Sequence, residues 1–297
     1  MKAENLATEV PFYPGLSAVA ERYDAFIIDL WGVMHDGLKA YPAAVEALGR
    51  LKRAGKRTVM LSNAPRRAAV ITARNAEMGL PADLPDHLLS SGEDAWQHLK
   101  TRPDGWYQAL GPRCYHLGPA RDLGMREGLD LTFVDSLAEA DFILNTGILH
   151  DLDQVETYRH FLDEGLARKL PMICANPDLI VMRGEAMEIC AGALALDYEQ
   201  KGGDVRWHGK PHPEVYRSCF KLLEGIAPSR IAAIGDSLRT DVAGAQASGI
   251  GSIFIAGGIH GEEMHVDSKG RVDPEAYEAF MAAAEWKPTV ALPFMRW

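Results

Sequence analysis

Residues 24–33 read Asp-Ala-Phe-Ile-Ile-Asp-Leu-Trp-Gly-Val, an apolar run that ends at a carboxylate and a glycine. A short apolar run bounded in this way is typical of a buried strand in a parallel sheet. In open α/β sheets, ligands bind beyond the carboxyl ends of the strands. Asp29 therefore lies where a functional side chain is expected, although a lone Asp at a strand end also commonly caps the helix that follows.

The same kind of apolar run predicts three further strands, at Arg57–Leu61, Ile231–Ile234 and Ser252–Ile255. Helix-like segments lie between these runs. In Ala43–Ala54, for example, apolar residues recur on one face, and Gly55 follows as a stop signal. Because strands and helices alternate, we predict an α/β fold with a doubly wound, Rossmann-like parallel sheet.

The middle of the chain repeats this alternation with its own apolar runs, at Arg113–Leu117, Ala140–Leu144 and Leu170–Ala175. Two segments of linker-like composition, Pro81–Pro85 and Gln200–Gly203, bracket this region. We therefore predict two domains: a core formed by residues 1–86 and 202–297, and an inserted α/β domain formed by residues 87–201.

Composition limits the partners of the chain. Of its 297 residues, 47% are hydrophobic and 24% are charged, as in a folded globular protein. Its 31 Lys and Arg against 41 Asp and Glu give a formal charge of −10, which argues against nucleic acid and anionic membranes as partners. Residues 1–25 lack the apolar stretch of a signal peptide, no run is long enough to span a bilayer, and the four cysteines show no C-x-x-C spacing. We expect a cytoplasmic protein with a small-molecule partner.

Polar residues suited to phosphate binding follow the second predicted strand and precede a later helix. Ser62 and Asn63 offer a hydroxyl and an amide to a phosphate oxygen, although a Ser at this point also serves as an N-cap. Residues 209–213 read Gly-Lys-Pro-His-Pro, so Lys210 lies on a loop stiffened by two prolines. A plain surface lysine is the alternative interpretation.

The strongest single signal is the segment Ile-Gly-Asp-Ser-Leu-Arg-Thr-Asp at residues 234–241. Its two carboxylates, Asp236 and Asp241, flank a strand-to-helix turn where both can face one hard cation. Asp29 and Ser62 are expected at the same edge of the sheet. The pattern therefore predicts a metal site with polar neighbours.

Taken in order, Asp29, Ser62, Lys210 and the Asp236/Asp241 pair resemble the four motifs of the haloacid dehalogenase-like (HAD) superfamily, over nearly the whole chain. The long insertion between Ser62 and Lys210 is similar to the cap domain of its class IIA branch, the p-nitrophenylphosphatase-like and sugar phosphatase-like enzymes. The details that agree with this branch are Ser-Gly-Glu at 91–93, Leu-Gly-Pro at 117–119 and Asn-Pro-Asp at 176–178.

The resemblance implies a Mg²⁺-dependent phosphatase-type hydrolase that acts on a small phosphorylated metabolite, such as a sugar phosphate, a nucleotide or a cofactor phosphate. It makes Asp29 the nucleophile that forms an aspartyl-phosphate. The metal ligands that it implies are Asp29, the backbone carbonyl of Trp31, Asp236 and Asp241, the last of which holds either the water shell of the metal or Lys210. The phosphate and substrate ligands that it implies are Ser62, Asn63, Lys210 and Asn176.

The chain departs from the family pattern at Trp31. In phosphatases of this superfamily the position is normally a second Asp that protonates the leaving group, and an indole cannot transfer a proton at neutral pH. General acid catalysis commonly contributes about 10²–10⁴-fold to a rate. The lost acid could be replaced by His35, Asp36 or His208, although the first two also suit a turn and the third a solvated loop.

Two other accounts of Trp31 are equally compatible with the sequence. The substrate could carry a good leaving group, as in an aryl or acyl phosphate, and need no acid. Alternatively, the protein could bind a phosphorylated ligand and turn it over poorly or not at all. A phosphotransferase or carbon–halogen hydrolase is disfavoured by the Asp236/Asp241 pair. The resemblance leaves open whether the protein is a homodimer, and whether the apolar segment 293–297 packs on the core or on a partner.

Overall fold

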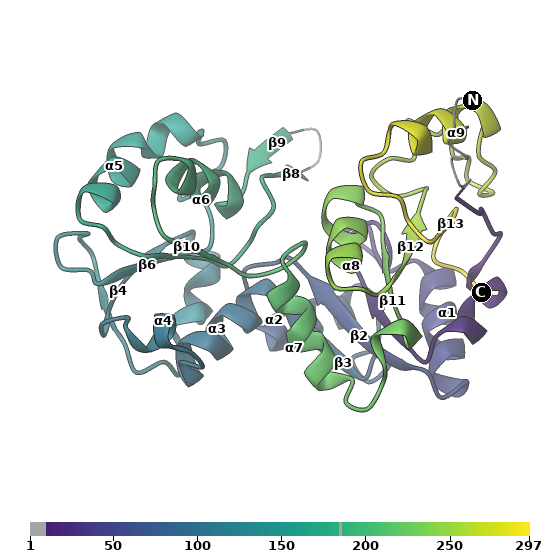
Figure 1. Ribbon diagram of the computed structural model, residues 1–297, viewed down its shortest axis with the longest axis horizontal. Helices are drawn as coiled ribbons and strands as arrows, with labels where there is room; N and C mark the ends of the chain where they lie inside the picture. Colours follow the sequence, from purple (N-terminus) through teal and green to yellow (C-terminus); the bar gives the residue numbers. More distant parts are fainter. Residues whose placement is uncertain (1–9, 184–185) are drawn as a thin grey trace, which may run out of the picture. The chain divides into compact units, whose positions relative to one another are not determined.

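The computed structural model describes residues 10–183 and 186–297 of the chain (Figure 1). The chain forms two compact units. The first comprises residues up to Leu61 together with Thr72–Leu88 and Tyr216–Trp297, and the second comprises Ser62–Ile71 and Leu89–Val215.

The first unit contains a six-stranded sheet with the strand order β13-β12-β11-β1-β2-β3. Its strands are β1 (Ala25–Ile28), β2 (Arg57–Ser62), β3 (His87–Ser90), β11 (Ile231–Gly235), β12 (Gly251–Ile255) and β13 (Val290–Leu292). The last residues of β2 and β3 belong to the second unit. β1 pairs in parallel with both β2 and β11, so that Ile28 lies beside Met60 and Ile234. Parallel pairing brings the carboxyl ends of β1 and β11 to the same edge.

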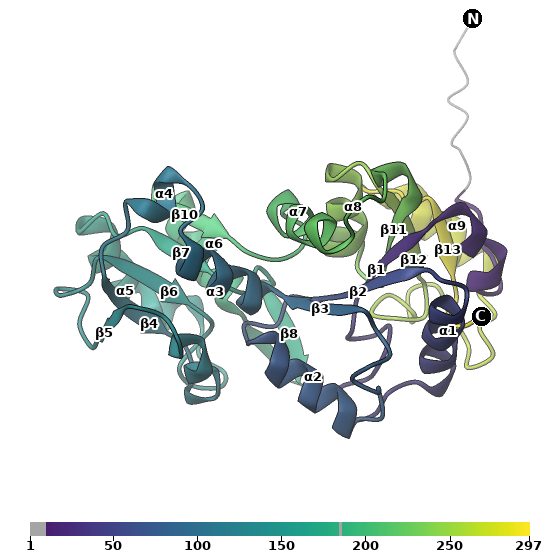
Figure 2. The ribbon, with the colours of Figure 1, turned by 90° about the horizontal axis from the view of Figure 1, so that it is seen from below.

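Helices cover both faces of this sheet. They are α1 (Pro42–Arg53), α2 (Ala68–Glu77), α7 (Pro213–Leu222), α8 (Ala243–Ala247) and α9 (Pro274–Ala283). Figure 2 shows α1 and α2 on one side of the sheet and α7 and α8 on the other. α1 begins with Pro42 at its first turn, buries Leu48 and Leu51, and is followed by Gly55 with a φ of +71°, a conformation that glycine adopts without strain.

The second unit is built around a five-stranded parallel sheet with the order β10-β7-β6-β4-β5. Its strands are β4 (Arg113–Leu117), β5 (Thr132–Val134), β6 (Phe142–Asn145), β7 (Met172–Cys174) and β10 (Val205–Trp207). Its helices are α3 (Ser91–Thr101), α4 (Gly105–Gln108), α5 (Arg159–Ala167) and α6 (Ala191–Gln200). A separate antiparallel hairpin consists of β8 (Ile180–Arg183) and β9 (Ala186–Ile189).

Side chains on the two faces of the second sheet enter two different apolar clusters. Ile143 of β6 packs with α5 and α6, whereas its neighbours Phe142 and Leu144 pack with α3 and α4. This alternation is the period of two that a strand dictates. Figure 1 accordingly shows α5 and α6 on one face of the sheet and α3 and α4 on the other. The second unit is therefore a three-layer α/β/α structure.

Short helical segments fill several connections. 3₁₀ turns occupy Leu16–Ala18, Ala20–Arg22, Ala120–Arg126, Val155–Tyr158 and Pro228–Arg230, and one π-helical turn, Leu238–Val242, precedes α8. Within residues 10–183 and 186–297, every helix falls short of the length and hydropathy that crossing a membrane requires.

The predicted α/β fold with a doubly wound parallel sheet is confirmed, and every predicted strand run overlaps an observed strand. The strands that the sequence did not predict are the edge strands β3, β13, β5 and β10, and the hairpin β8–β9. Of these, β10 has no continuous apolar run because it is only partly covered: it reads Val-Arg-Trp and exposes its central Arg206.

The boundaries of the two compact units differ from the domain boundaries that the sequence predicts. Residues 62–71 and 202–215, which the sequence-based division assigned to the core, lie in the second unit. The role of the inserted region as a cap that selects the substrate stays a prediction. The C-terminal segment packs on the first unit, where Met295 is buried and the Leu16 N–H donates to the Arg296 carbonyl at 2.7 Å.

Residue His116, at the end of β4, links stability to pH. Arg126 Nε donates to its Nδ1 at 3.0 Å, and its Nε2 lies 2.9 Å from Thr146 Oγ1. Burial, together with the charge of Arg126, lowers the pKa of His116 to about 4. The folded pKa thus lies below the unfolded value of about 6.5, so the folded state loses stability as the pH falls from about 6.5 towards 4.

We predict that, between about pH 7 and about pH 4.5, the free energy of unfolding falls by about 2 kcal/mol more in the wild type than in a His116→Asn variant. Asparagine offers an acceptor to Arg126 but does not titrate. Urea denaturation at several pH values measures the difference, and an identical pH dependence of the two proteins would contradict the assignment.

Candidate functional site

Three carboxylates converge beyond the ends of β1 and β11. Asp29 follows β1, Asp236 follows β11, and Asp241 lies in the π-helical turn Leu238–Val242. One carboxylate oxygen from each lies within 4.8 Å of the others. Asp236 and Asp241 are each only 3% exposed. Asp29, Asp236 and Asp241, which we call the carboxylate triad, are therefore brought together as the sequence predicted.

Glycines let the backbone approach the triad closely. A Cβ at Gly32, which has a φ of +78°, would lie 2.0 Å from Asp236 Oδ2, and a Cβ at Gly258 would lie 2.2 Å from Asp236 Cβ. A Cβ at Gly235 would lie 1.9 Å from Asp241 Cγ. Backbone N–H groups also hold the carboxylates, since Ile259 donates to Asp236 Oδ2 at 3.0 Å and Ser237 to Asp241 Oδ2 at 3.2 Å.

The donor set of the triad fits a hard divalent cation. Carboxylates this close repel one another unless a positive charge or bound protons offset them. Oxygen ligands are the ones that Mg²⁺ and Ca²⁺ prefer. The side chains present and the glycine-lined approach therefore suit a divalent metal.

The segment after β1 forms a tight loop that presents Trp31. The Gly32 N–H donates to the His35 carbonyl at 2.9 Å, and Trp31 and His35 form an isolated β-bridge. The indole lies against Gly37, where a Cβ would be 2.5 Å from Trp31 Cη2, and it is still 52% exposed. A large apolar side chain is thus held in a fixed orientation two residues from Asp29.

His35 and Asp36, two of the predicted substitute acids, both accept hydrogen bonds from backbone N–H groups of this loop. His35 is buried and its Nδ1 accepts the Gly37 N–H at 3.1 Å, while burial lowers its pKa. Asp36 Oδ1 accepts the N–H groups of Lys39 and Leu38 at 2.8 and 2.9 Å, and these hydrogen bonds lower the pKa of Asp36. A lowered carboxyl pKa favours the ionised form, which has no proton to donate at neutral pH.

In the second unit, Asn63 and Lys210 are joined by two hydrogen bonds. The Lys210 N–H donates to Asn63 Oδ1 at 2.8 Å, and Asn63 Nδ2 donates to the Lys210 carbonyl at 3.0 Å. Asn63 Nδ2 also donates to Asp178 Oδ1 at 2.8 Å. Both amide hydrogens of Asn63 therefore have protein acceptors, and its side chain fixes the lysine loop.

The remaining predicted ligands also lie in ordered turns of the second unit. Ser62 Oγ accepts the Ala64 N–H at 3.2 Å. Asn176 Oδ1 accepts the Asp178 N–H at 3.1 Å, which connects this turn to Asp178 and so to Asn63. The phosphate-binding roles of Ser62, Asn63, Lys210 and Asn176 stay predictions.

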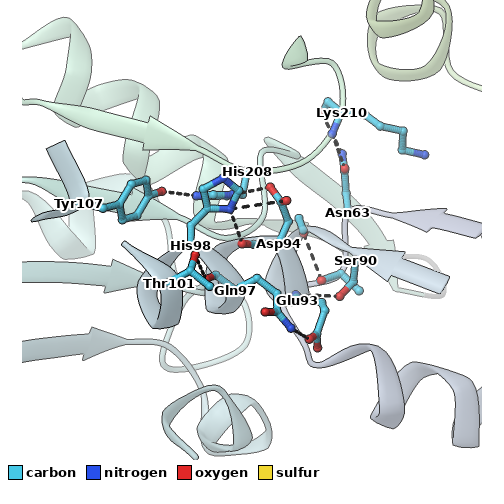
Figure 3. A network of polar contacts seen from close by, with 12 residues as sticks. Asn63, Ser90, Glu93, Asp94, Gln97, His98, Thr101, Tyr107, His208 and Lys210 are labelled. Carbon is cyan, nitrogen blue, oxygen red and sulfur yellow. Dashed lines mark hydrogen bonds and ion pairs between the residues drawn. The ribbon is translucent and has the colours of Figure 1, made fainter. Parts of the chain in front are cut away.

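His208, the third predicted substitute acid, lies in a buried polar network and not in a solvated loop. His208 Nδ1 is 2.6 Å from Asp94 Oδ2, and its Nε2 is 2.5 Å from the Tyr107 hydroxyl (Figure 3). Asp94 and Tyr107 were not predicted from the sequence. The signal available was the spacing of Asp94 and His98, one helical turn apart, but nothing in the sequence connects either residue with Tyr107.

Comparison with known proteins agrees with this geometry. The family model described as haloacid dehalogenase-like hydrolase matches residues 26–131, and a second model, described as HAD-hydrolase-like, matches residues 207–278. The crystal structure of a haloacid dehalogenase-like hydrolase from Brucella suis is 32% identical, with a TM-score of 0.79, over 95% of this chain and 99% of that chain.

Two curated relatives carry phosphatase names. Ribonucleotide monophosphatase NagD of Escherichia coli is 26% identical over 237 residues, which cover 78% of this chain and 87% of that protein. Acid sugar phosphatase of Staphylococcus aureus is 22% identical over 248 residues, which cover 80% of this chain and 88% of that protein. The chain is thus similar to these proteins over most of their length.

The bonds around Asn63 generate a stability prediction. Replacing Asn63 by Asp removes both N–H donors and places a new carboxylate against Asp178 and the Lys210 carbonyl. We expect Asn63→Asp to lower the free energy of unfolding by about 2–4 kcal/mol.

The double variant Asn63→Asp/Asp178→Asn restores a donor opposite the new carboxylate and should recover about 1 kcal/mol or more of that loss. Urea denaturation measures both effects. A double variant no more stable than Asn63→Asp would show that the contact with Asp178 does not matter.

Proposed function

Because the chain belongs to the haloacid dehalogenase-like hydrolase family, we propose that it is a Mg²⁺-dependent phosphoric monoester hydrolase. The observation that carries the proposal is the carboxylate triad, in which Asp29 meets Asp236 and Asp241. The phosphatase names of the NagD and acid sugar phosphatase relatives support the reaction class. These names also favour a nucleotide or a sugar phosphate as the substrate.

In this proposal Asp29 is the nucleophile. One of its oxygens bonds to phosphorus while the bond from phosphorus to the leaving oxygen breaks, and water later hydrolyses the aspartyl-phosphate. When bound, Mg²⁺ would be held by Asp29, the Trp31 carbonyl, Asp236 and Asp241, and it supplies the positive charge that offsets repulsion between the carboxylate and the phosphate.

Ser62 and Lys210 are proposed as the phosphate ligands. A hydroxyl and an ammonium group are donors that match phosphate oxygens. The side chain of Asn63 acts on Lys210 through the two backbone hydrogen bonds described above. Asn176 accepts a hydrogen bond from the Asp178 N–H, and Asp178 accepts one from Asn63. In this proposal Asn176 therefore helps to position the loop that contains Lys210.

Trp31 restricts the leaving groups. His35, His208 and the ionised Asp36 are poor replacements for a general acid, because each side chain is already engaged in hydrogen bonds within the protein. A leaving oxygen that departs without a proton is one with a low pKa. In this proposal the enzyme therefore turns over aryl or acyl phosphates faster than alkyl phosphates, and the alkyl phosphate of a nucleotide or a sugar is a slow substrate.

The proposal predicts that Asp29→Asn lowers Mg²⁺-dependent release of phosphate from p-nitrophenyl phosphate by about 10⁴-fold or more, as loss of a nucleophile does. Addition of EDTA should abolish the activity, and Mg²⁺ should restore it. Asp24→Asn is the matched control: Asp24 lies just before β1, pairs with Arg230 at 2.7 Å, and should leave the rate unchanged. An Asp29→Asn protein as active as the wild type would refute the proposal.

A second prediction concerns Trp31. Trp31→Asp should raise the turnover of an alkyl phosphate by about 10²–10⁴-fold, because it supplies a general acid, and should change that of an aryl phosphate much less. Trp31→Asn is the control, since it removes the indole without supplying an acid. Equal gains from Trp31→Asp and Trp31→Asn would mean that the bulk of the indole, and not the missing proton, limits the wild type.

A further inference from the structure

Three buried side chains of the second unit are connected in a row by polar contacts. The Tyr107 hydroxyl is 2.5 Å from His208 Nε2, and His208 Nδ1 is 2.6 Å from Asp94 Oδ2 (Figure 3). All three residues are at most 3% exposed. Tyr107 comes from α4, Asp94 from α3, and His208 directly follows β10. We call these residues the Tyr107–His208–Asp94 network.

The chemistry of the three side chains determines which atoms in this network donate and which accept hydrogen bonds. Burial raises the pKa of Tyr107, so its hydroxyl keeps its proton and is available as a donor. When His208 Nδ1 donates to Asp94 Oδ2, the other nitrogen of a neutral imidazole, Nε2, holds the lone pair that accepts the proton of the Tyr107 hydroxyl. Each member of the chain thus has a definite donor or acceptor role.

These residues also resemble a metal site, since ligand atoms of Asp94, His98 and His208 lie within 4.8 Å of one another. The proton positions argue against it. His98 Nδ1 is 2.8 Å from the Asp94 backbone carbonyl, which can only accept, so this nitrogen carries a proton. His208 Nδ1 carries one as well. Nitrogens that are protonated towards Asp94 have no lone pair for a metal there.

The network is anchored on a helix that also holds the segment after β2. At the start of α3, Ser91 Oγ donates to the Ala64 carbonyl at 3.1 Å, and the Gly92 N–H donates to the same carbonyl at 3.2 Å. Glu93 accepts from Arg67 Nε at 2.7 Å. The first turn of α3 therefore fixes the segment that begins with Ser62 and Asn63, while Asp94 in the same turn fixes His208.

His208 in turn fixes the backbone that leads to Lys210. The His208 N–H donates to the Cys174 carbonyl at 2.9 Å. Gly209 has a φ of +106°, and a Cβ there would lie 2.6 Å from Asn63 Oδ1. The next residue, Lys210, makes its two hydrogen bonds with Asn63. Lys210 is thus held from one side by Asn63 and from the other, through Gly209, by His208.

We propose that the Tyr107–His208–Asp94 network positions Lys210 for binding the phosphate group of the substrate. The inference rests on the proposed function, in which Lys210 is a phosphate ligand. Tyr107, His208 and Asp94 are positioning residues, which act through the lysine loop and touch no reacting atom. Binding geometry of this kind is sensitive to displacements of about 1 Å, so loosening the loop weakens phosphate binding.

The test compares two tyrosines whose hydroxyls make similar buried hydrogen bonds. Tyr107→Phe removes the donor to His208 and keeps the ring. Tyr198→Phe is the matched control, because the Tyr198 hydroxyl donates to the Leu170 carbonyl at 2.7 Å in the same unit and has no bond to the lysine loop. Isothermal titration with inorganic phosphate in the presence of Mg²⁺ measures the dissociation constant of each protein well below its melting temperature.

We expect Tyr107→Phe to weaken phosphate binding by up to about tenfold, because the free energy of one lost hydrogen bond is the upper limit of an effect that acts through the lysine loop, and Tyr198→Phe to leave it unchanged. His208→Asn, which keeps a donor for Asp94 but loses the acceptor for Tyr107, should weaken binding in the same direction. Unchanged binding in Tyr107→Phe would overturn the inference, and so would an equal loss in Tyr198→Phe, which would indicate a general loss of stability.

A double variant tests whether the effect passes through Lys210. In a Lys210→Met background, Tyr107→Phe should cause no further weakening, and a full additional loss would overturn the inference. Should Lys210→Met bind no phosphate at all, the contrast between the two tyrosine variants decides.

Failure of the proposed function would look different. A wild type that binds phosphate but hydrolyses no phosphate ester would refute the hydrolase and leave the positioning network intact. A wild type that binds no phosphate would refute the role of Lys210 and the inference with it.

Discussion

The structure depends on holding three carboxylates closer together than their charges favour. Asp29, Asp236 and Asp241 place oxygens within 4.8 Å of one another, and two of these residues are almost completely buried. The parallel pairing of β1 with β11 meets this constraint, because it ends both strands at one edge. Glycines at 32, 235 and 258 allow the backbone to close around the triad. A neighbouring alanine would collide with a carboxylate, so the glycines and the triad require each other.

In the second unit, hydrogen bonds between polar groups hold the loop that contains Lys210. This lysine loop is held by amide, imidazole and phenol groups, and the carboxylate oxygen of Asp94 accepts a hydrogen bond from His208. Buried polar groups stabilise a single geometry only when each is satisfied. The position of the Lys210 backbone therefore depends on several hydrogen bonds of modest strength.

The parts of this protein that the sequence predicts are those encoded by short segments. Apolar runs identify the central strands, and Asp236 and Asp241 are five residues apart, so their meeting needs only one turn. Edge strands such as β10 lack the apolar signal because they are partly covered. The Tyr107–His208 and Asp94–His208 bonds join residues 101 and 114 positions apart, and only the tertiary fold creates them. For the same reason the sequence suggested His208 as a substitute acid or a solvated loop residue, and did not predict its burial.

The way the two units are interleaved has a consequence for synthesis on the ribosome. All residues of the second unit have been made once Val215 is reached, whereas the six-stranded sheet still lacks β11, β12 and β13 at that point and is complete only at Leu292. At about 5–20 residues per second, the 77 residues from 216 to 292 take roughly 4–15 s. In the first part of that interval, until β11 and the turn that contains Asp241 have been made, β1 has only β2 beside it, and Asp29 lacks its two acidic neighbours. The inserted unit is therefore able to fold first, and the triad can form only afterwards, once β11 pairs with β1.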